Sequence, residues 1–220
     1  TGKVVLIDMS MSMRATDIKP NRLERAKYKA IDLIKSIDEG DIGLVAYAGD
    51  AFTISPLSSD AQNLTTLLPS LTPEIMPIQG SEPFLGLKAA AELLQNAGYL
   101  EGEIFWVTDG IEMAQVAELR ELISQLPYRI SVLGVGSADG APIQLLDGDF
   151  LKDPRGAIVV PKLNGNTLSG LARASGGRYS SITANDNGKL AGIEGKIHAV
   201  QGKFFLHCPW KKGLPQPANI

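Results

Sequence analysis

The stretch Val4-Val5-Leu6-Ile7-Asp8-Met9-Ser10-Met11-Ser12 carries the clearest indication of the fold. Four consecutive apolar residues followed at once by polar ones are typical of a short strand that is buried on both faces of a parallel sheet. Asp8, Ser10 and Ser12 then place one carboxylate and two hydroxyl groups at alternate positions just beyond the strand. Open α/β sheets bind ligands at this carboxyl edge. The stretch therefore predicts a buried strand and a candidate site at its end.

Strand-like apolar runs alternate with helix-period segments along most of the chain. Residues 22–37 indicate a helix most clearly, because their apolar positions recur at helical spacing and Asn21 is a suitable N-cap. Residues 42–48 and 52–55 are separated by a hairpin-length turn, which predicts one antiparallel strand at an edge. We expect an α/β fold with a mostly parallel central sheet and helices on both faces. The other expected elements are strands at 104–107, 130–135 and 178–182, and helices at 83–97, 115–126 and 167–174.

Composition and charge exclude several classes of protein. The chain has 220 residues, of which 44% are apolar, enough for the core of one ordinary domain. Its 24 acidic and 21 basic residues include no basic run of the kind found in nucleic-acid-binding surfaces. No apolar stretch approaches the roughly 18 residues that span a bilayer, and no signal segment opens the chain. The single cysteine, Cys208, excludes an intrachain disulfide framework. We expect a soluble domain trimmed from a longer protein.

Two regions depart from the alternation of strands and helices. Residues 137–162 are rich in Gly, Pro, Asp and Ala, and they predict a long loop with a β-like run at 158–160. Residues 201–220 hold aromatic residues and three prolines without a period. We therefore predict one domain over residues 1–200, including this decorated loop, followed by a tail at 201–220 to which no structure is assigned.

Two further segments supply oxygen ligands. A second apolar strand ends at Asp109-Gly110, which places another carboxylate at a strand end. Between the two strands, the loop Gln79-Gly80-Ser81-Glu82 offers a hydroxyl group at the entrance of a helix. Oxygen-only ligands with little charge suit Mg²⁺, which keeps several of its waters. Mn²⁺ and Ca²⁺ are the other candidate ions. The predicted metal ligands are Asp8, Ser10, Ser12, Ser81 and Asp109.

These three loops, in this order, resemble the metal-ion-dependent adhesion site (MIDAS) of the von Willebrand factor A (VWA) domain. The family pattern is Asp-x-Ser-x-Ser, a later Thr, and Thr-Asp-Gly or a similar run after the fourth strand. The chain departs from it in having Ser81 for the Thr, and Met11 where Gly most often separates the two serines. Further stretches resemble the bacterial aerotolerance-operon (Bat-type, BatB-like) subgroup, namely 17–27, 43–52, 134–136, 140–143 and 176–179.

The resemblance implies a fold, a function and a location. The fold is the three-layer Rossmann-like VWA fold, with a mostly parallel central sheet, one antiparallel edge strand and helices on both faces. The function is a non-enzymatic interaction module: the hydroxyl groups contact the metal, the aspartates act through water, and an Asp or Glu of a partner protein completes the shell. Subgroup members hold this domain beside membrane-spanning helices, which implies an inner-membrane protein with the domain on the periplasmic side, or alternatively on the cytoplasmic face.

The residues around the expected cation predict the surface that a partner contacts. Four methionines lie at strand ends rather than along a helix face, where they would form an adaptable apolar rim around the cation. Packing of Met9 beneath the turn is the competing explanation. The predicted partner-binding residues are Met9, Met11, Met13, Gln79, Glu82 and Met113.

Other interpretations of the same residues stay open. The first turn could be an acidic turn whose serines cap local backbone groups, in a VWA scaffold without bound metal. A divalent-metal phosphohydrolase shares the opening strand and Asp8, but its chemistry needs a second Asp two residues on, where this chain has Ser10. The two histidines, His198 and His207, form no metalloprotease pair. Gly134-x-Gly136 follows the fifth strand rather than the first, which disfavours a dinucleotide loop.

Overall fold

A six-stranded sheet organises residues 1–182, the part of the chain that the computed structural model describes. The strand order is β3-β2-β1-β4-β5-β6, in which β2 and β3 pair antiparallel at one edge and the other neighbours pair parallel. This confirms the predicted mostly parallel sheet with one antiparallel edge strand. The strands are β1 (Gly2–Asp8), β2 (Ile42–Tyr47), β3 (Ala51–Ser58), β4 (Gly102–Thr108), β5 (Arg129–Val135) and β6 (Tyr179–Ile182).

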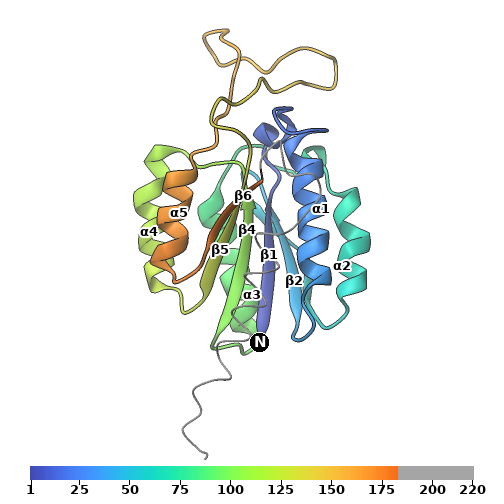
Figure 1. Cartoon of the computed structure of the whole chain (residues 1–220), viewed down its shortest axis with the longest axis vertical. Helices are drawn as coiled ribbons and strands as arrows, with labels where there is room; N and C mark the ends of the chain where they lie inside the picture. Colours follow the sequence, from blue (N-terminus) through green and yellow to red (C-terminus); the bar gives the residue numbers. More distant parts are fainter. Residues whose placement is uncertain (183–220) are drawn as a thin grey trace, which may run out of the picture. The chain divides into compact units, whose positions relative to one another are not determined.

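Helices flank the sheet on both faces (Figure 1). Apolar residues of α3, α4 and α5 join one core cluster with the strands, whereas α1 and α2 contact each other on the other face. No helix within residues 1–182 combines the length and the apolar character needed to cross a bilayer. The helices are α1 (Arg22–Lys35), α2 (Ala61–Leu67), α3 (Pro83–Asn96), α4 (Val116–Gln125) and α5 (Gly165–Ala174), with short 3₁₀ turns η1 (Met11–Arg14), η2 (Leu68–Ser70), η3 (Pro73–Ile75) and η4 (Met113–Gln115).

Strand β1 lies at the centre of the sheet, which explains its uninterrupted apolar run. Val4 and Leu6 belong to the core cluster formed with α3, including Leu87. Val5 and Ile7 are equally buried and, because strand side chains alternate, face the layer of α1 and α2. A strand covered on both faces needs apolar side chains at every position, whereas a half-exposed strand alternates with polar residues.

Helix α1 begins where the sequence predicts. The side chain of Asn21 accepts a hydrogen bond from the backbone N–H of Glu24 at 2.8 Å, which satisfies one of the free donors of the first turn. Ala26, Ala30 and Ile34 recur every four residues and are completely buried. Arg22 lies on the same stripe, one turn before Ala26, and is also completely buried. A buried guanidinium group requires buried partners, which for Arg22 are the carboxylates of Asp17 and Asp109.

Helix α2 is an element that the sequence pattern did not predict. It has seven residues, of which only Leu64 is buried, so no helical period is long enough to recognise. Its start is fixed by Asp60, whose side chain accepts hydrogen bonds from the N–H groups of Gln62 and Asn63. Strand β3 is also longer than the predicted 52–55.

Residues 137–162 form a segment without helices, called here the projecting loop. It extends beyond the carboxyl edge of the sheet, above η1 and the start of α1 (Figure 1). Antiparallel bridges at Gln144–Phe150 and Lys152–Ile158 fold it back on itself twice. A hydrogen bond of 3.0 Å from the Leu163 N–H to the Ser137 carbonyl closes its base. The predicted domain end at residue 200, the predicted tail, both histidines and Cys208 lie outside the described residues.

Candidate metal site

The ends of β1 and β4 bring two carboxylates to one edge of the sheet. These strands are parallel neighbours, with Ile7 paired to Val107, so that the residues after them share the same edge. Strand order also reverses here: β2 follows β1 on one side and β5 follows β4 on the other. In open α/β sheets such a reversal point is where ligands bind. Asp8 and Asp109 are therefore placed where this fold favours a site.

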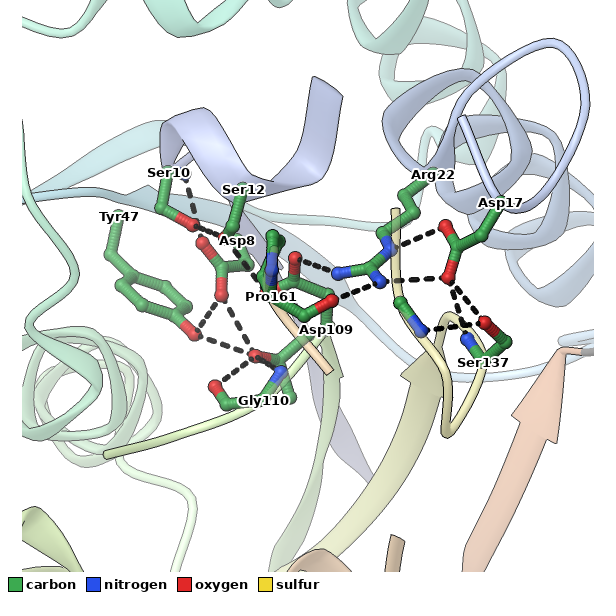
Figure 2. Close-up of polar contacts among 12 residues, drawn as sticks. Asp8, Ser10, Ser12, Asp17, Arg22, Tyr47, Asp109, Gly110, Ser137 and Pro161 are labelled. Carbon is green, nitrogen blue, oxygen red and sulfur yellow. Dashed lines mark hydrogen bonds and ion pairs between the residues drawn. The ribbon is translucent and has the colours of Figure 1, made fainter. Parts of the chain in front are cut away.

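A single turn of 3₁₀ helix, η1, directs the two serines back toward the sheet (Figure 2). The Ser10 and Ser12 hydroxyl oxygens are 2.9 Å apart, and Ser12 donates to Asp109 Oδ1 at 3.0 Å. Because Ser12 has a single hydroxyl proton and gives it to Asp109, Ser10 is the donor between the two serines. Three of the five predicted ligands thus form one continuous hydrogen-bonded chain.

Asp8 is completely buried and accepts hydrogen bonds at both oxygens. Its Oδ1 accepts from the Ser10 N–H at 2.9 Å, which fixes the turn after β1. Its Oδ2 accepts from the hydroxyl groups of Tyr47 and Thr108, each at 2.8 Å. The indole N–H of Trp106 donates to the Tyr47 oxygen at 3.0 Å. Asp8 therefore anchors the end of three neighbouring strands, β2, β1 and β4.

Arg22 is the principal residue of this edge that the sequence pattern did not single out. Its Nη1 donates to Asp109 Oδ2 at 2.8 Å, while Nε and Nη2 donate to the two oxygens of Asp17 at 2.8 and 2.7 Å. Figure 2 shows the guanidinium group between the two carboxylates. Its position in the apolar stripe of α1 was the available signal, since a charge there requires a buried partner. Tyr47, Thr108 and Asp17 carried no comparable signal.

Burial alters the proton affinity of the two site carboxylates. Burial is the largest cause that raises the pKa of Asp8, and hydrogen bonds from Ser10, Thr108 and Tyr47 oppose it. Burial and the charge of Asp8 raise the pKa of Asp109 to about 7, although Arg22 and Ser12 act in the opposite direction. A carboxylate is stabilised least where solvent is excluded and a second negative charge is near. A bound cation would relieve both effects.

Ser81 lies in a loop that is held between the ends of β2 and β4. The Glu82 N–H donates to the Ala48 carbonyl at 2.7 Å, next to the end of β2. On the other side, the Gln115 side chain donates to the Ser81 carbonyl at 2.9 Å from η4, which follows β4. Gly49 makes this docking possible, because a Cβ there would lie 2.4 Å from the Gln79 carbonyl oxygen. The loop therefore lies at the same edge as the serines and aspartates.

The structure corrects part of the predicted partner-binding surface. Met9 and Met13 are completely buried, so they pack in the interior and cannot form a rim; for Met9 this agrees with the competing explanation. The Gln79 side chain donates to the carbonyl groups of Pro73 and Met76 within its own loop and is exposed. The other predicted residues are accessible as well: Met11 is half-buried, and Glu82 and Met113 are exposed.

Exposed apolar residues that the sequence analysis missed lie beside this edge. Ile78 is 51% exposed, and its carbonyl accepts from the Gly49 N–H, which ties it to the turn after β2. In the projecting loop, Leu146, Phe150, Ile158 and Val160 are exposed. An apolar pattern without a period gave no indication that these side chains face outward.

The donor set of the site suits a hard cation held by few charges. Within residues 1–182, no three His, Cys, Asp or Glu side chains lie close enough together to hold a metal ion by themselves. A cation at this edge would need hydroxyl ligands as well, and Ser10 and Ser12 offer them beside two carboxylates. Neutral oxygen ligands with a minority of carboxylates are typical of Mg²⁺ sites.

A family comparison and two solved structures place this geometry among known proteins. The profile of the von Willebrand factor type A domain matches residues 4–112. BatB from Bacteroides thetaiotaomicron is 29% identical and superposes with a TM-score of 0.79. The alignment covers 92% of this chain and 99% of the BatB chain. An aerotolerance-related membrane protein from Bacteroides fragilis is 31% identical, with the same coverage and TM-score.

A curated relative extends beyond the matched region. A protein from Borreliella burgdorferi is 27% identical over 186 residues, which is 81% of this chain and 53% of that protein. The chain therefore spans about half the length of this relative.

Proposed function

Because the chain belongs to the von Willebrand factor type A domain family and to its aerotolerance-related, BatB-like group, we propose that it binds a protein partner through a metal ion, Mg²⁺. The observation that carries the proposal is the continuous contact from Ser10 through Ser12 to Asp109, beside Asp8. It joins residues more than ninety positions apart at the edge where this fold binds ligands.

Ser10 and Ser12 would hold the cation directly, with Ser81 as the hydroxyl ligand from the neighbouring loop. In an octahedral shell with Mg–O distances of about 2.1 Å, adjacent ligand oxygens are about 3 Å apart. The two serine oxygens are separated by 2.9 Å. Asp8 and Asp109 already accept hydrogen bonds at both oxygens, which supports a role through water molecules.

Charge supports a divalent ion rather than a monovalent one. The single guanidinium group of Arg22 contacts two carboxylates, those of Asp17 and Asp109, and the buried carboxylate of Asp8 adds a third negative charge near Asp109. This leaves an excess of negative charge in a buried region, which is costly unless it is balanced. When bound, the cation would supply residual positive charge that attracts an anionic oxygen of the partner. The proposed partner therefore offers an Asp or Glu carboxylate.

The proposed contact surface surrounds this cation. Met11, Glu82 and Met113 lie on the three loops of the site, and Ile78 adds an exposed apolar side chain on the loop that leads to Ser81. An apolar surround excludes water from a central charged contact, as in the energetically important centres of protein interfaces.

The Bacteroides fragilis neighbour is described as a membrane protein. We propose, from the resemblance to the Bat-type subgroup, that the domain of the full-length protein lies on the periplasmic side of the inner membrane.

A binding role agrees better than phosphohydrolase chemistry with the state of Asp8. An aspartate nucleophile must reach its substrate, but Asp8 is completely buried, and three hydrogen bonds engage its two oxygens. Residue 10 is also Ser, so the second Asp of that chemistry is absent from its position. We therefore propose a protein-interaction domain without enzymatic activity.

Calorimetric titration with Mg²⁺ and Mn²⁺ tests the metal site. We expect binding with micromolar to millimolar Kd in the wild-type protein, and loss of binding in Ser12→Ala and Asp109→Asn. Ser124→Ala is the matched control, because the Ser124 hydroxyl donates to a carbonyl of α4 away from this edge. Equal binding by all four proteins, or none by the wild-type protein, would contradict the proposal.

Partner capture from native membranes tests the binding surface. We expect a captured protein to be lost on chelation and with Met113→Asp, because the new carboxylate repels that of the partner. Leu100→Asp is the control, since Leu100 is an exposed apolar residue before β4, at the opposite end of that strand from Asp109. Capture that is insensitive to chelator and to Met113→Asp would place the binding face elsewhere.

A further inference from the structure

The Arg22 guanidinium joins the site to the base of the projecting loop. Beyond its bonds to Asp109 and Asp17, its Nη2 donates to the carbonyl of Pro161, near the end of that loop, at 2.8 Å. At the start of the loop, both the N–H and the hydroxyl of Ser137 donate to Asp17 Oδ2, at 2.8 and 2.9 Å. Both ends of the loop are thus fastened to the Asp17–Arg22 ion pair, as Figure 2 shows.

Glycines allow this close arrangement. Gly136 has a positive φ of 140°, and a Cβ there would lie 3.0 Å from the Arg22 guanidinium carbon. Gly140 has a φ of 72°, and a Cβ there would lie 2.3 Å from the carbonyl oxygen of Pro161, the acceptor of Arg22. The end of the projecting loop also approaches the residue after Asp109, because a Cβ on Gly110 would be 3.6 Å from the Lys162 carbonyl oxygen. The loop base and the site therefore share a closely packed region.

We propose that Arg22 and Asp17 are positioning residues for Asp109, and that they couple cation binding to the attachment of the projecting loop. This inference rests on the function proposed above. Within residues 1–182, Asp109 is the predicted metal ligand that Arg22 contacts, so Arg22 acts through that carboxylate. The loop then becomes a part of the partner-binding edge whose position depends on the cation.

The coupling follows from the geometry of the guanidinium group. It is planar and presents its N–H donors in a fixed fork, so a displaced acceptor on one side rotates the whole group. Rotation would move Nη1 away from Asp109 Oδ2, and Asp109 Oδ1 is the acceptor that orients Ser12. Coupling between two binding events is reciprocal. Loosening the loop base should weaken cation binding, and cation binding should tighten the loop base.

Gly140→Ala tests the coupling without changing any charge. The added Cβ must displace Pro161, so we expect Mg²⁺ affinity measured by calorimetry to fall about fivefold or more. Gly148→Ala and Gly156→Ala are matched controls in the same loop: both have positive φ, 91° and 83°, but nothing lies within 4 Å of their added Cβ. The strain of a side chain at positive φ is common to the three variants. A loss of affinity confined to Gly140→Ala would therefore report the displacement of Pro161, the acceptor of Arg22.

Limited digestion with trypsin tests the reciprocal effect. Arg155 is exposed near the outer end of the projecting loop and offers a cleavage site. We expect Mg²⁺ to slow cleavage at Arg155 in the wild-type protein and in Gly156→Ala, but not in Gly140→Ala. Ser137→Ala removes the hydrogen bond from the Ser137 hydroxyl to Asp17 and should behave like Gly140→Ala. It replaces Gly140→Ala in this test if Gly140→Ala does not fold.

The outcomes separate this inference from the proposed function. If the wild-type protein binds no Mg²⁺, both the metal-dependent function and the coupling are overturned. If it binds Mg²⁺ and Gly140→Ala and Ser137→Ala bind equally well, with cleavage at Arg155 unaffected by the ion, the coupling alone is overturned.

Discussion

At the scale of single residues, Asp109 makes the stability of the metal-free protein depend on pH. Its pKa is raised from 3.8 to about 7 by burial and by Asp8, so the folded state keeps a proton that the unfolded chain releases at lower pH. Stability falls with rising pH wherever the folded state binds more protons. In chelator, we therefore expect the melting temperature to decrease between pH 5 and pH 7.5, by several degrees.

Asp109→Asn should reduce that decrease, because a neutral amide does not titrate. Thermal melts of both proteins across the same pH series give the comparison. The carboxyl pKa values of Asp17 and Glu74 are lowered, so their contributions fall below this window. Burial also raises the pKa of Asp8, so a smaller decrease of the same sign should remain in Asp109→Asn. A decrease of the same size in both proteins would assign it to another group.

Tyr47 connects the core to the site through its hydroxyl group. Tyr47→Phe removes a donor from Asp8 and leaves the buried Trp106 N–H without its acceptor. An unsatisfied buried polar group costs about 1–3 kcal/mol, and we expect a loss of this size in urea unfolding. Tyr28→Phe, on the exposed face of α1, should change stability by less than about 0.5 kcal/mol. Equal effects would show that the Tyr47 hydroxyl is not needed.

Single residues also mark the limit of prediction from the sequence. Asp8, Ser10, Ser12 and Asp109 could be assigned to one edge because each follows a recognisable strand. Their link to Arg22 could not, since 87 positions separate Arg22 from Asp109 and only the packing of α1 determines the contact. The burial of Met9 and Met13 was missed for the same reason: apolar residues in a turn give no period that says which way they face.

At the scale of elements, the close packing of α3 on β2 determines the position of Tyr47. Gly86 of α3 faces its ring, and an added Cβ would lie 2.8 Å from a ring carbon. Gly86→Ala should therefore destabilise the protein by about 1–3 kcal/mol through overpacking. Gly170→Ala in α5 is the contrasting variant: nothing lies within 4 Å, so it should stabilise by about 0.5–1 kcal/mol through helix propensity. Urea unfolding that gives the same sign for both would contradict this account of α3.

Helices long enough to repeat their apolar pattern over several turns were predicted closely, whereas short elements were not. Helix α1 begins at the predicted residue and ends two residues early, and α3 ends one residue before its predicted end. Helix α2 has no period to read, and its capping residue Asp60 resembles any polar loop residue. The projecting loop was recognised by composition, but its two bridges and its attachment to Asp17 and Arg22 depend on contacts that composition does not encode.

At the scale of the whole molecule, the strand order explains why distant loops meet. The alternation of strands and helices predicted a parallel sheet, whereas the order β3-β2-β1-β4-β5-β6 places the reversal between the two aspartate-bearing strands. Two carboxylates are thereby buried at one point of the fold, at a cost in stability that a divalent cation would offset. The domain should therefore be more stable with the metal than without it.

Metal binding to the folded state alone stabilises by RT ln(1 + [L]/Kd), which is about 2.7 kcal/mol when the ion is present at a hundred times Kd. For a domain of this size, that gain corresponds to a rise in melting temperature of about 5–10 °C. We expect this rise for the wild-type protein in saturating Mg²⁺ and none for Asp109→Asn, measured at pH 8, where the wild-type carboxyl group is largely ionised. The comparison separates specific binding from a general effect of salt, because Na⁺ at matched ionic strength screens surface charges in both proteins alike. A melting temperature that stays flat through the Mg²⁺ titration would mean that Arg22 alone balances the buried carboxylates, and that the site holds no cation.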